Sequence, residues 1–191
     1  MAGAATYTVV LDANVLYPIY CSDLIMSLTE TRLFHARWSK DIEDEAKRNL
    51  VKNRPDLKRK IPKRIAAMRN AVPDCMIDNY QSLIGSLKLP DPNDCHVLAA
   101  AIVGHADAIV TFNLKDFPKR TVGKFNIEVI HPDDFVMNQI NLNQVACLTA
   151  IKEMRTRWNN PAYSAAQMTD FYCANSLPQT GSFLKSAIHL I

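Results

Sequence analysis

Short β-branched apolar runs, separated by longer segments of helical periodicity, constrain the fold of this chain most strongly. Residues 6–11, 108–111 and 127–130 are such runs, and the segments between them place apolar side chains three and four residues apart. Parallel strands need connections of this length, because each crossover returns the chain to the same edge of the sheet. The sequence therefore predicts a three-layer α/β/α sandwich with a short, mostly parallel central sheet.

The pattern changes beyond about residue 140, where no further strand is predicted. Three helices are expected there instead, over residues 144–158, 161–174 and 182–190. We therefore divide the chain into an α/β domain over residues 1–140 and a helical C-terminal extension over residues 141–191. A chain of 191 residues is long enough for one well-packed domain with such an appendage.

Local signals place several helix ends. A helix is expected from about residue 22 to residue 32, and Ser39 is expected to cap the next one. Pro62 interrupts a helical run that begins near residue 55, so we expect a kink or two shorter helices there. The helix over residues 92–104 is expected to end at Gly104 in a left-handed C-cap.

Cysteine usage and hydropathy indicate a cytoplasmic protein. The five cysteines are scattered and form no Cys-x-x-Cys pair, which favours buried, reduced thiols and disfavours a zinc site. No run approaches the ~20 apolar residues that a membrane span needs. The N-terminus also lacks the basic and apolar regions of a secretory signal. We expect no association with a membrane.

Basic residues are concentrated in residues 47–69, which we call the basic segment. It holds ten of the 22 lysines and arginines and a single acid, Asp56. The positive electrostatic field of such a segment attracts phosphates or acidic protein partners. The alternative interpretation is a solvated helical face.

Three acids lie at element ends, where a site of an α/β protein is expected. Asp12 ends the first strand, and Asp91 and Asp94 open the helix before the second buried strand. Carboxylates without a histidine or cysteine motif beside them favour a hard divalent cation. Each acid also has a structural interpretation: Asp91 as an N-cap, Asp94 as an acid complementing the helix dipole, and Asp12 as a turn residue.

A further acid is expected from the helix after Ser39. Glu43 and Glu45 are both candidates, and helical periodicity does not choose between them. Asn14, two residues after Asp12, is a candidate for supporting a ligand by a hydrogen bond. The two tryptophans, Trp38 and Trp158, are interpreted as packing residues.

Four stretches in order resemble the motifs of PIN domains. They are VVLDANVLYP (residues 9–18), WS followed by EAKRNL (38–39 and 45–50), LPDPNDCHVLAAA (89–101) and AIVTFNLKDFP (108–118). The similarity covers roughly residues 6–138. The remaining tail is similar to the helical C-terminal extension of some VapC-like members.

The resemblance implies a metal-dependent ribonuclease, commonly the toxin of a bacterial toxin–antitoxin pair and commonly a homodimer. By position it assigns the core acids to Asp12, Glu45 and Asp94, and it selects Glu45 over Glu43. Asp91 matches a less uniform acid of the same motif. Many PIN domains have an aspartate where this chain has Asn113, with Asp116 three residues further on, so a second metal ion would be held more weakly there.

We therefore expect an endoribonuclease that uses Mg²⁺ or Mn²⁺ and pairs with a VapB-like antitoxin. The expected metal ligands are Asp12, Glu45, Asp91, Asp94, Asn113 and Asp116. The expected substrate contacts are Lys47, Arg48, Lys58, Arg59, Lys60, Lys63, Asn14 and Thr111. The alternatives are a catalytically silent PIN-like module that binds nucleic acid or protein, and a PIN-fold nuclease that acts in RNA processing or on DNA. An unrelated Mg²⁺ enzyme is disfavoured, because no phosphoenzyme motif surrounds Asp12.

Overall fold

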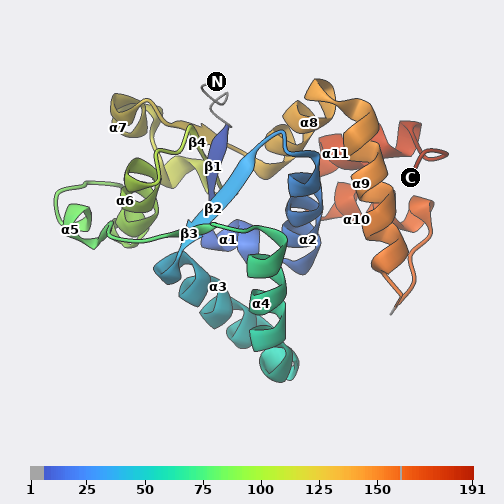
Figure 1. Ribbon diagram of the computed structural model, residues 1–191, viewed down its shortest axis with the longest axis horizontal. Coiled ribbons are helices and arrows are strands. Elements are labelled where there is room, and N and C mark those ends of the chain that lie inside the picture. Colours follow the sequence, from blue (N-terminus) through green and yellow to red (C-terminus); the bar gives the residue numbers. More distant parts are fainter. Residues whose placement is uncertain (1–6, 160) are drawn as a thin grey trace.

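A five-stranded parallel sheet forms the centre of the molecule (Figure 1). The computed structural model describes residues 7–159 and 161–191. The strands are β1 (Thr8–Leu11), β2 (His35–Ser39), β3 (Met76–Ile77), β4 (Ala108–Val110) and β5 (Glu128–Ile130). Their order is β3-β2-β1-β4-β5, and every neighbouring pair is parallel. The predicted fold class is confirmed.

The central strands form where the sequence has its buried apolar runs. Val9, Val10 and Leu11 of β1 have no exposed surface, and the same holds for all of β4. Strands covered on both faces need apolar side chains in succession rather than in alternation, which explains these runs. Thr6, expected as the first residue of β1, lies outside the described residues.

Helices cover both sides of the sheet. Figure 1 shows α5 and α6 on one side and α2 with α9, α10 and α11 on the other. The α-helices are α1 (Ala13–Leu16), α2 (Ile19–Leu28), α3 (Lys40–Asn53), α4 (Ile61–Ala71), α5 (Gln81–Ile84), α6 (Cys95–Val103), α7 (Lys119–Val122), α8 (Pro132–Leu142), α9 (Gln144–Arg157), α10 (Ala165–Ala174) and α11 (Pro178–Ser186). Short 3₁₀ helices are η1 (Thr29–Thr31), η2 (Pro55–Lys60), η3 (Pro92–Asp94), η4 (Leu114–Asp116) and η5 (Gly123–Phe125).

The helices after β1 begin earlier than expected. A single turn, α1, follows Asp12 directly, and α2 starts at Ile19 rather than near residue 22. The extended backbone of Pro18 separates the two helices. Proline disfavours a helical residue before it and presets its own φ angle, so it marks the break between α1 and α2.

The helical run that begins at residue 55 forms two elements, η2 and α4, rather than one kinked helix. Ser39 caps α3 by accepting a hydrogen bond from the Ile42 N–H at 3.3 Å, as predicted. Pro55 then opens η2, and Pro62 lies in the first turn of α4. Proline is tolerated there because the first N–H groups of a helix have no partner within it. Figure 1 shows α3 and α4 projecting below the sheet and converging toward η2.

The prediction for the end of α6 is wrong in one detail. Gly104 follows α6, but its φ of −74° is right-handed. The left-handed residue is His105, with a φ of 49°. The turn before β4 is therefore reached one residue later than expected, and glycine's conformational freedom is not what ends the helix.

Four helices form the C-terminal part of the chain. The His131 ring accepts a hydrogen bond from the Asp133 N–H and caps α8. The buried Asp133 carboxylate accepts bonds from the N–H groups of Gln179 and Thr180, each at 2.8 Å. These are free donors of the first turn of α11, so this carboxylate fastens α11 to α8. The domain boundary after residue 140 falls near the end of α8 and stays a prediction.

All five cysteines are unpaired, and four of them are buried. Within residues 7–159 and 161–191, no helix combines the length and the apolar character needed to cross a membrane.

Candidate metal and nuclease site

Asp12 stands where the order of the strands reverses. It directly follows β1, and its N–H donates to the Val110 carbonyl of β4 at 3.1 Å. Strands β1 and β4 are neighbours in the sheet but are separated by two other strands in sequence. Ligands of parallel α/β proteins bind in the crevice at such a switch point, beyond the carboxyl ends of the strands.

The Asp12 carboxylate is buried and held from several directions. The Thr111 hydroxyl and the Asn14 side-chain amide donate to its Oδ2 atom at 2.7 and 2.6 Å, and the Ala13 N–H donates to its Oδ1 atom at 2.6 Å. Asn14 in turn accepts from the Phe112 N–H at 3.0 Å. Asn14 therefore holds the Asp12 carboxylate, while its expected contact with substrate stays a prediction. Thr111 has no exposed surface, so it supports this carboxylate instead of facing a substrate, which corrects its expected role.

Asp91 and Asp94 have different surroundings. Asp91 accepts a hydrogen bond from the Asn93 N–H at 2.9 Å and is the N-cap of η3. The Asp94 side chain makes no hydrogen bond or ion pair with any other described residue, although it is only partly exposed. Helix α6, which follows Asp94, packs on β1, β2 and β4. Asp91 is thus the structural member of the pair, and Asp94 is free to bind a ligand.

Glu45 approaches the same place from α3, which packs against both α1 and α6. Its Oε2 atom lies 3.3 Å from the Nε2 atom of His96. The other ring nitrogen of His96 is buried and has no partner among the described residues. His96 was not among the site residues expected from the sequence. Its position two residues after Asp94, on the helix facing Glu45, was the signal that could have found it.

Burial and mutual repulsion raise the pKa values of two of these acids. Burial raises the pKa of Asp12 to about 6, with a further contribution from the charge of Glu45, while the Thr111 hydrogen bond opposes the shift. Burial also raises the pKa of Asp94 to about 7, followed by the charges of Asp12, Asp91, Asp116 and Glu45. No lysine or arginine of the described chain is among the main influences on either group. The acids therefore converge without a compensating lysine or arginine, and only the charge of His96 opposes the shift at Asp12 among the described side chains that could be cationic.

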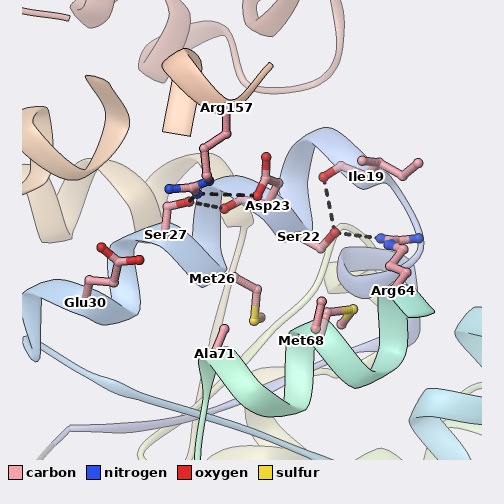
Figure 2. Close-up of a pocket in the computed structure, with 11 residues that line it drawn as sticks. Ile19, Ser22, Asp23, Met26, Ser27, Glu30, Arg64, Met68, Ala71 and Arg157 are labelled. Atoms are coloured by element: carbon pink, nitrogen blue, oxygen red, sulfur yellow. Dashed lines mark hydrogen bonds and ion pairs between the residues drawn. The ribbon is translucent and has the colours of Figure 1, made fainter. Parts of the chain in front are cut away.

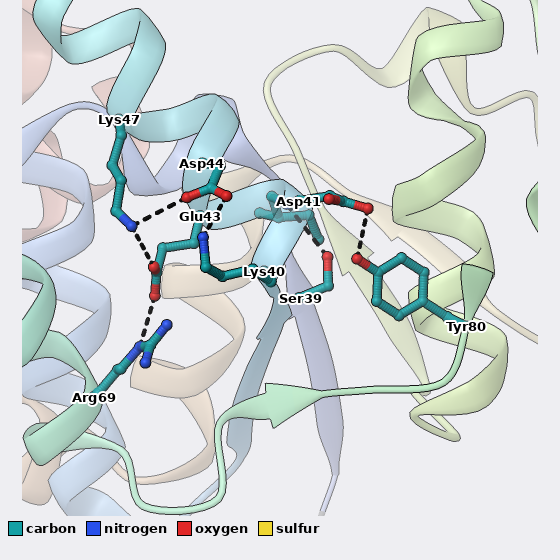
Figure 3. Close-up of polar contacts among 9 residues, drawn as sticks. Ser39, Lys40, Asp41, Glu43, Asp44, Lys47, Arg69 and Tyr80 are labelled. Carbon is teal, nitrogen blue, oxygen red and sulfur yellow. Dashed lines mark hydrogen bonds and ion pairs between the residues drawn. The ribbon is translucent and has the colours of Figure 1, made fainter.

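Glu43 belongs to a different cluster (Figure 3). Its carboxylate has no exposed surface and accepts hydrogen bonds from Lys47 and Arg69, each at 2.7 Å. Burial alone would raise the pKa of Glu43, but the bonds from Arg69 and Lys47 outweigh burial and hold it below its usual value. Glu43 thus joins α3 to α4, while Glu45 lies near the other acids. This geometry agrees with the choice made from the resemblance.

Asn113 and Asp116 are the remaining expected metal ligands. The Asn113 side-chain amide donates to the Asp116 carboxylate, and the Asn113 N–H donates to the Thr111 hydroxyl at 3.0 Å. Asp116 also contributes to the raised pKa of Asp94. With its amide nitrogen used on Asp116, Asn113 keeps a neutral carbonyl oxygen as its only donor for a cation.

The cations of the basic segment divide into two groups. Lys47 and Arg69 are used on Glu43, and Lys47 also contacts Asp44 at 3.1 Å. The remaining candidates are exposed and form no ion pair or hydrogen bond with another described residue: Arg48, Lys58, Arg59, Lys60 and Lys63. This second group is free to meet an anionic ligand, whereas Lys47 is held by its acids.

Arg64 fastens the basic segment to the turn after α1 and to α2, and Figure 2 shows its bond to Ser22 of α2. Its guanidinium donates to the Leu16 and Tyr17 carbonyls at 2.6 and 3.1 Å, and to the Ser22 hydroxyl at 2.6 Å. It lines a cavity of about 500 Å³ between α2, α4 and the end of α9. The acids of the site are not among the residues that line this cavity. Arg64 is therefore a structural arginine that links α4 to the segment following Asp12.

The donor chemistry at the switch point fits a hard cation. In the part of the chain that the structure describes, no three His, Cys, Asp or Glu side chains are grouped so that they could hold a metal ion together. Magnesium needs no such cage, since it keeps several waters and is bound by one or two carboxylates with substrate phosphates. Burial is the main cause of the raised pKa values of Asp12 and Asp94, and neighbouring acids raise them further, so a bound cation would favour the charged forms of both carboxylates.

The fold, the acids and the sequence motifs define a PIN domain. Residues 8–115 match the family model of the PIN domain, so more than half of the chain is covered and the chain belongs to this family. Residues 132–186 match a second model, the VapC50 C-terminal domain. The resemblance of both parts of the chain is thereby confirmed.

A curated relative agrees with both matches. The chain is 35% identical over 91 residues to a protein of Mycobacterium tuberculosis (strain ATCC 25618 / H37Rv) named "Putative ribonuclease VapC50". The alignment covers 48% of this chain and 53% of the relative, so the chain spans about half the length of the curated relative it matches. No solved structure matches the chain.

Proposed function

We propose that the protein is a metal-dependent endoribonuclease that hydrolyses RNA phosphodiester bonds with Mg²⁺ or Mn²⁺. The observation that carries this proposal is the unpartnered, partly buried Asp94 carboxylate beside the buried carboxylate of Asp12. Folding does not favour such an arrangement, because burial, and then the charge of neighbouring acids, raises the pKa of both groups. A site retained at this cost is a candidate functional site. Membership of the PIN family and the name of the relative support the same activity.

The residues of the chain would divide the work of the reaction. Asp12 and Asp94 would hold the cation, and Glu45 would complete the negative site with Asp91, Asn113 and Asp116 around it. A bound divalent cation supplies charge stabilisation for the phosphate and favours deprotonation of a water nucleophile. The hydrogen bonds of Thr111 and Asn14 fix the Asp12 carboxylate before substrate arrives. Such pre-orientation avoids reorganisation during the reaction.

The free cations of the basic segment would bring RNA to an otherwise repulsive site. A cluster of acids repels phosphates, so the backbone has to be attracted by charges located elsewhere on the surface. Arg48, Lys58, Arg59, Lys60 and Lys63 are exposed and available for this. Their contribution to binding should weaken as salt rises, since phosphate contacts release condensed counterions.

We propose further that the protein is the toxin of a toxin–antitoxin pair, with a VapB-like antitoxin and a homodimeric assembly. The match of residues 132–186 to the VapC50 C-terminal domain supports this role, as does the name of the relative. A small reading frame next to this gene that encodes an antitoxin would support the pairing. The cytoplasmic location expected from the cysteines stays a prediction.

Cleavage of a structured RNA by the purified protein tests the activity. We expect cleavage with Mg²⁺ or Mn²⁺ and its loss when a chelator removes the ion, because the acids repel one another and the substrate without a counter-charge. Re-addition of the cation should restore the activity. RNA that is bound but never cut with any divalent cation would contradict the proposal and would favour the silent binding module. A parallel assay on single- and double-stranded DNA separates a ribonuclease from a DNA nuclease.

Neutralising the free cations should weaken RNA binding without changing the fold. The change is Lys58, Arg59, Lys60 and Lys63 to glutamine together, and binding is measured at several salt concentrations. We expect the slope of log affinity against log salt to fall by up to about 0.7 for each phosphate of a single strand that the variant no longer neutralises. Lys152→Gln with Lys185→Gln is a charge-reducing control far along the chain. If neither the affinity nor the slope changed, the basic segment would be a solvated helical face and not an RNA-binding surface.

A further inference from the structure

An aromatic groove runs between the PIN domain and the C-terminal helices. Its volume is about 610 Å³. The groove is defined here by Tyr17, Tyr20, Leu57, Trp158, Tyr163 and Phe171, which line it. Three of these residues come from the turn between α9 and α10 or from α10 itself. The groove is thus built jointly by the two parts of the chain.

The aromatic rings of the groove contact one another edge to face. Ring centroids are 5.6 Å apart for Trp158 and Tyr163, 6.0 Å for Tyr163 and Phe171, and 5.4 Å for Phe171 and Tyr20. All four side chains remain partly exposed. Edge-to-face packing is favourable in itself, and it fixes the rings in place. The groove therefore offers rigid aromatic surface rather than side chains free to collapse into it.

Positive charge borders the groove on one side. Leu57 belongs to η2, whose next three residues are Lys58, Arg59 and Lys60. These cations are exposed and without partners among the described residues. Arg54 also lines the groove, although it is ion-paired with Asp56 at 2.8 Å. Aromatic surface beside a row of free cations is the combination by which proteins bind single-stranded nucleic acid.

The groove and the acidic site are built on the same two elements, α1 with its flanking residues and α3. Asp12 caps the start of α1, and Tyr17 follows its end, which separates their backbones by roughly 8 Å along the helix axis. Glu45 and the groove residue Leu50 likewise lie in successive turns of α3. This shared framework places the groove next to the segments that carry Asp12 and Glu45.

We infer that the aromatic groove binds unstacked bases of the RNA strand next to the bond that is cut. This inference rests on the proposed function and gives the C-terminal extension a role in holding substrate. Bases would stack on the rings, while the phosphates would face Lys58, Arg59 and Lys60. Trp158, expected from the sequence to be a packing residue, would also contact the ligand.

Trp158 provides a direct readout of binding. The other tryptophan, Trp38, has no exposed surface and supplies a constant background. The experiment uses the full chain carrying Asp94→Asn, so that RNA is bound without being cut. A ten-residue oligouridylate and an abasic ribose-phosphate chain of equal length are titrated separately. We expect the base-bearing oligonucleotide to quench the fluorescence of Trp158 and to bind more tightly than the abasic chain.

A matched pair of variants at Tyr163 tests the groove itself. The Tyr163 hydroxyl forms no hydrogen bond with a described residue, so Tyr163→Phe keeps the ring and should bind as before. Tyr163→Ala removes one stacking surface and should weaken binding of the base-bearing oligonucleotide about tenfold. Its affinity for the abasic chain should not change. Circular dichroism of both variants would test whether the fold is retained.

The outcomes separate this inference from the proposed function. If quenching depends on the bases but the wild type cleaves no RNA, the inference about the groove stands and the proposed nuclease activity is rejected. Acid-dependent cleavage with equal binding of both chains would reject the groove, and a segment of a protein partner would then be its remaining occupant. Equal loss of affinity for both chains in Tyr163→Ala would also overturn the inference, because it would indicate a structural defect.

Discussion

Replacing Asp94 by asparagine is expected to reduce RNA cleavage by about 10³-fold or more while the protein stays folded. Loss of a single preorganised hydrogen-bond donor already costs about 10²–10³-fold in other enzymes, and here a charged ligand of the cation would be lost. Asparagine has nearly the same shape and cannot ionise, so it tests the charge and not the packing. Initial rates with saturating Mg²⁺ or Mn²⁺ measure the effect, and Asp12→Asn should behave in the same way.

The same substitution should stabilise the metal-free protein at high pH. The pKa of Asp94 is raised to about 7 in the folded state, so the folded protein binds a proton that the unfolded chain releases near its usual pKa. The favourable contribution is complete below that usual pKa and is lost as pH rises through about 7. Asparagine removes the cost of ionisation. At pH 8 we expect the thermal midpoint of Asp94→Asn to exceed that of the wild type by roughly 2–4 °C, equivalent to about 1 kcal/mol after solvent screening.

Metal binding reverses this order. A cation that binds the folded state raises the midpoint of the wild type with concentration, and it should raise that of Asp94→Asn much less. A variant that is less stable than the wild type at pH 8, or that still cleaves RNA at a normal rate, would show that Asp94 is not the cation's ligand. The combination of lost activity and gained stability is the signature of a functional acid.

Glu43 and Glu45 should give opposite results when each is changed to glutamine. Glu43→Gln removes the charge of a buried carboxylate that pairs with Lys47 and Arg69. We expect the free energy of unfolding to fall by about 2 kcal/mol. For a chain of this size the thermal midpoint should fall by roughly 4–8 °C. Glu45→Gln removes a partly exposed acid beside His96, so its midpoint should change little while cleavage falls at least about 10²-fold.

The pH dependence of stability identifies the source of the Glu43 effect. The pKa of Glu43 is lowered in the folded state, so its ion pairs stabilise the protein above the usual pKa of glutamate and lose this effect as pH falls below it. The difference between the wild type and Glu43→Gln should therefore shrink in acid. Thermal melts from about pH 3 to pH 8 measure it. If Glu43→Gln were the inactive but stable variant, the two assignments would have to be exchanged.

Apolar runs were sufficient to predict β1, β4 and β5, and periodicity was sufficient for most of the longer helices. Buried apolar runs identified the strands, since few other elements require apolar residues in direct succession. The short helix α1 was not expected, because four residues are too few to show a helical period. The left-handed turn after α6 was placed at Gly104 on glycine's usual preference, whereas His105 adopts it. Local propensity is weak there compared with the packing of the turn.

The site was only partly accessible from the sequence. Asp12 and Asp94 follow from element ends, which are local features. The different roles of Glu43 and Glu45 depend on Arg69, which lies 26 positions after Glu43 and belongs to another helix. A helical wheel of α3 does not contain that information. The contact of His96 with Glu45 has the same character. The aromatic groove was also hidden, because its walls come from residues more than a hundred positions apart.

The contacts of Arg64 have a consequence for where a bound RNA would be cleaved. Its bonds to the Leu16 and Tyr17 carbonyls tie α4 to the segment that begins at Asp12. A strand gripped by the neighbouring cations would then reach Asp12 at a constant spacing. The position of cleavage would then be set by the number of nucleotides between the bound stretch and the site, and not by the identity of the base at the cleaved bond.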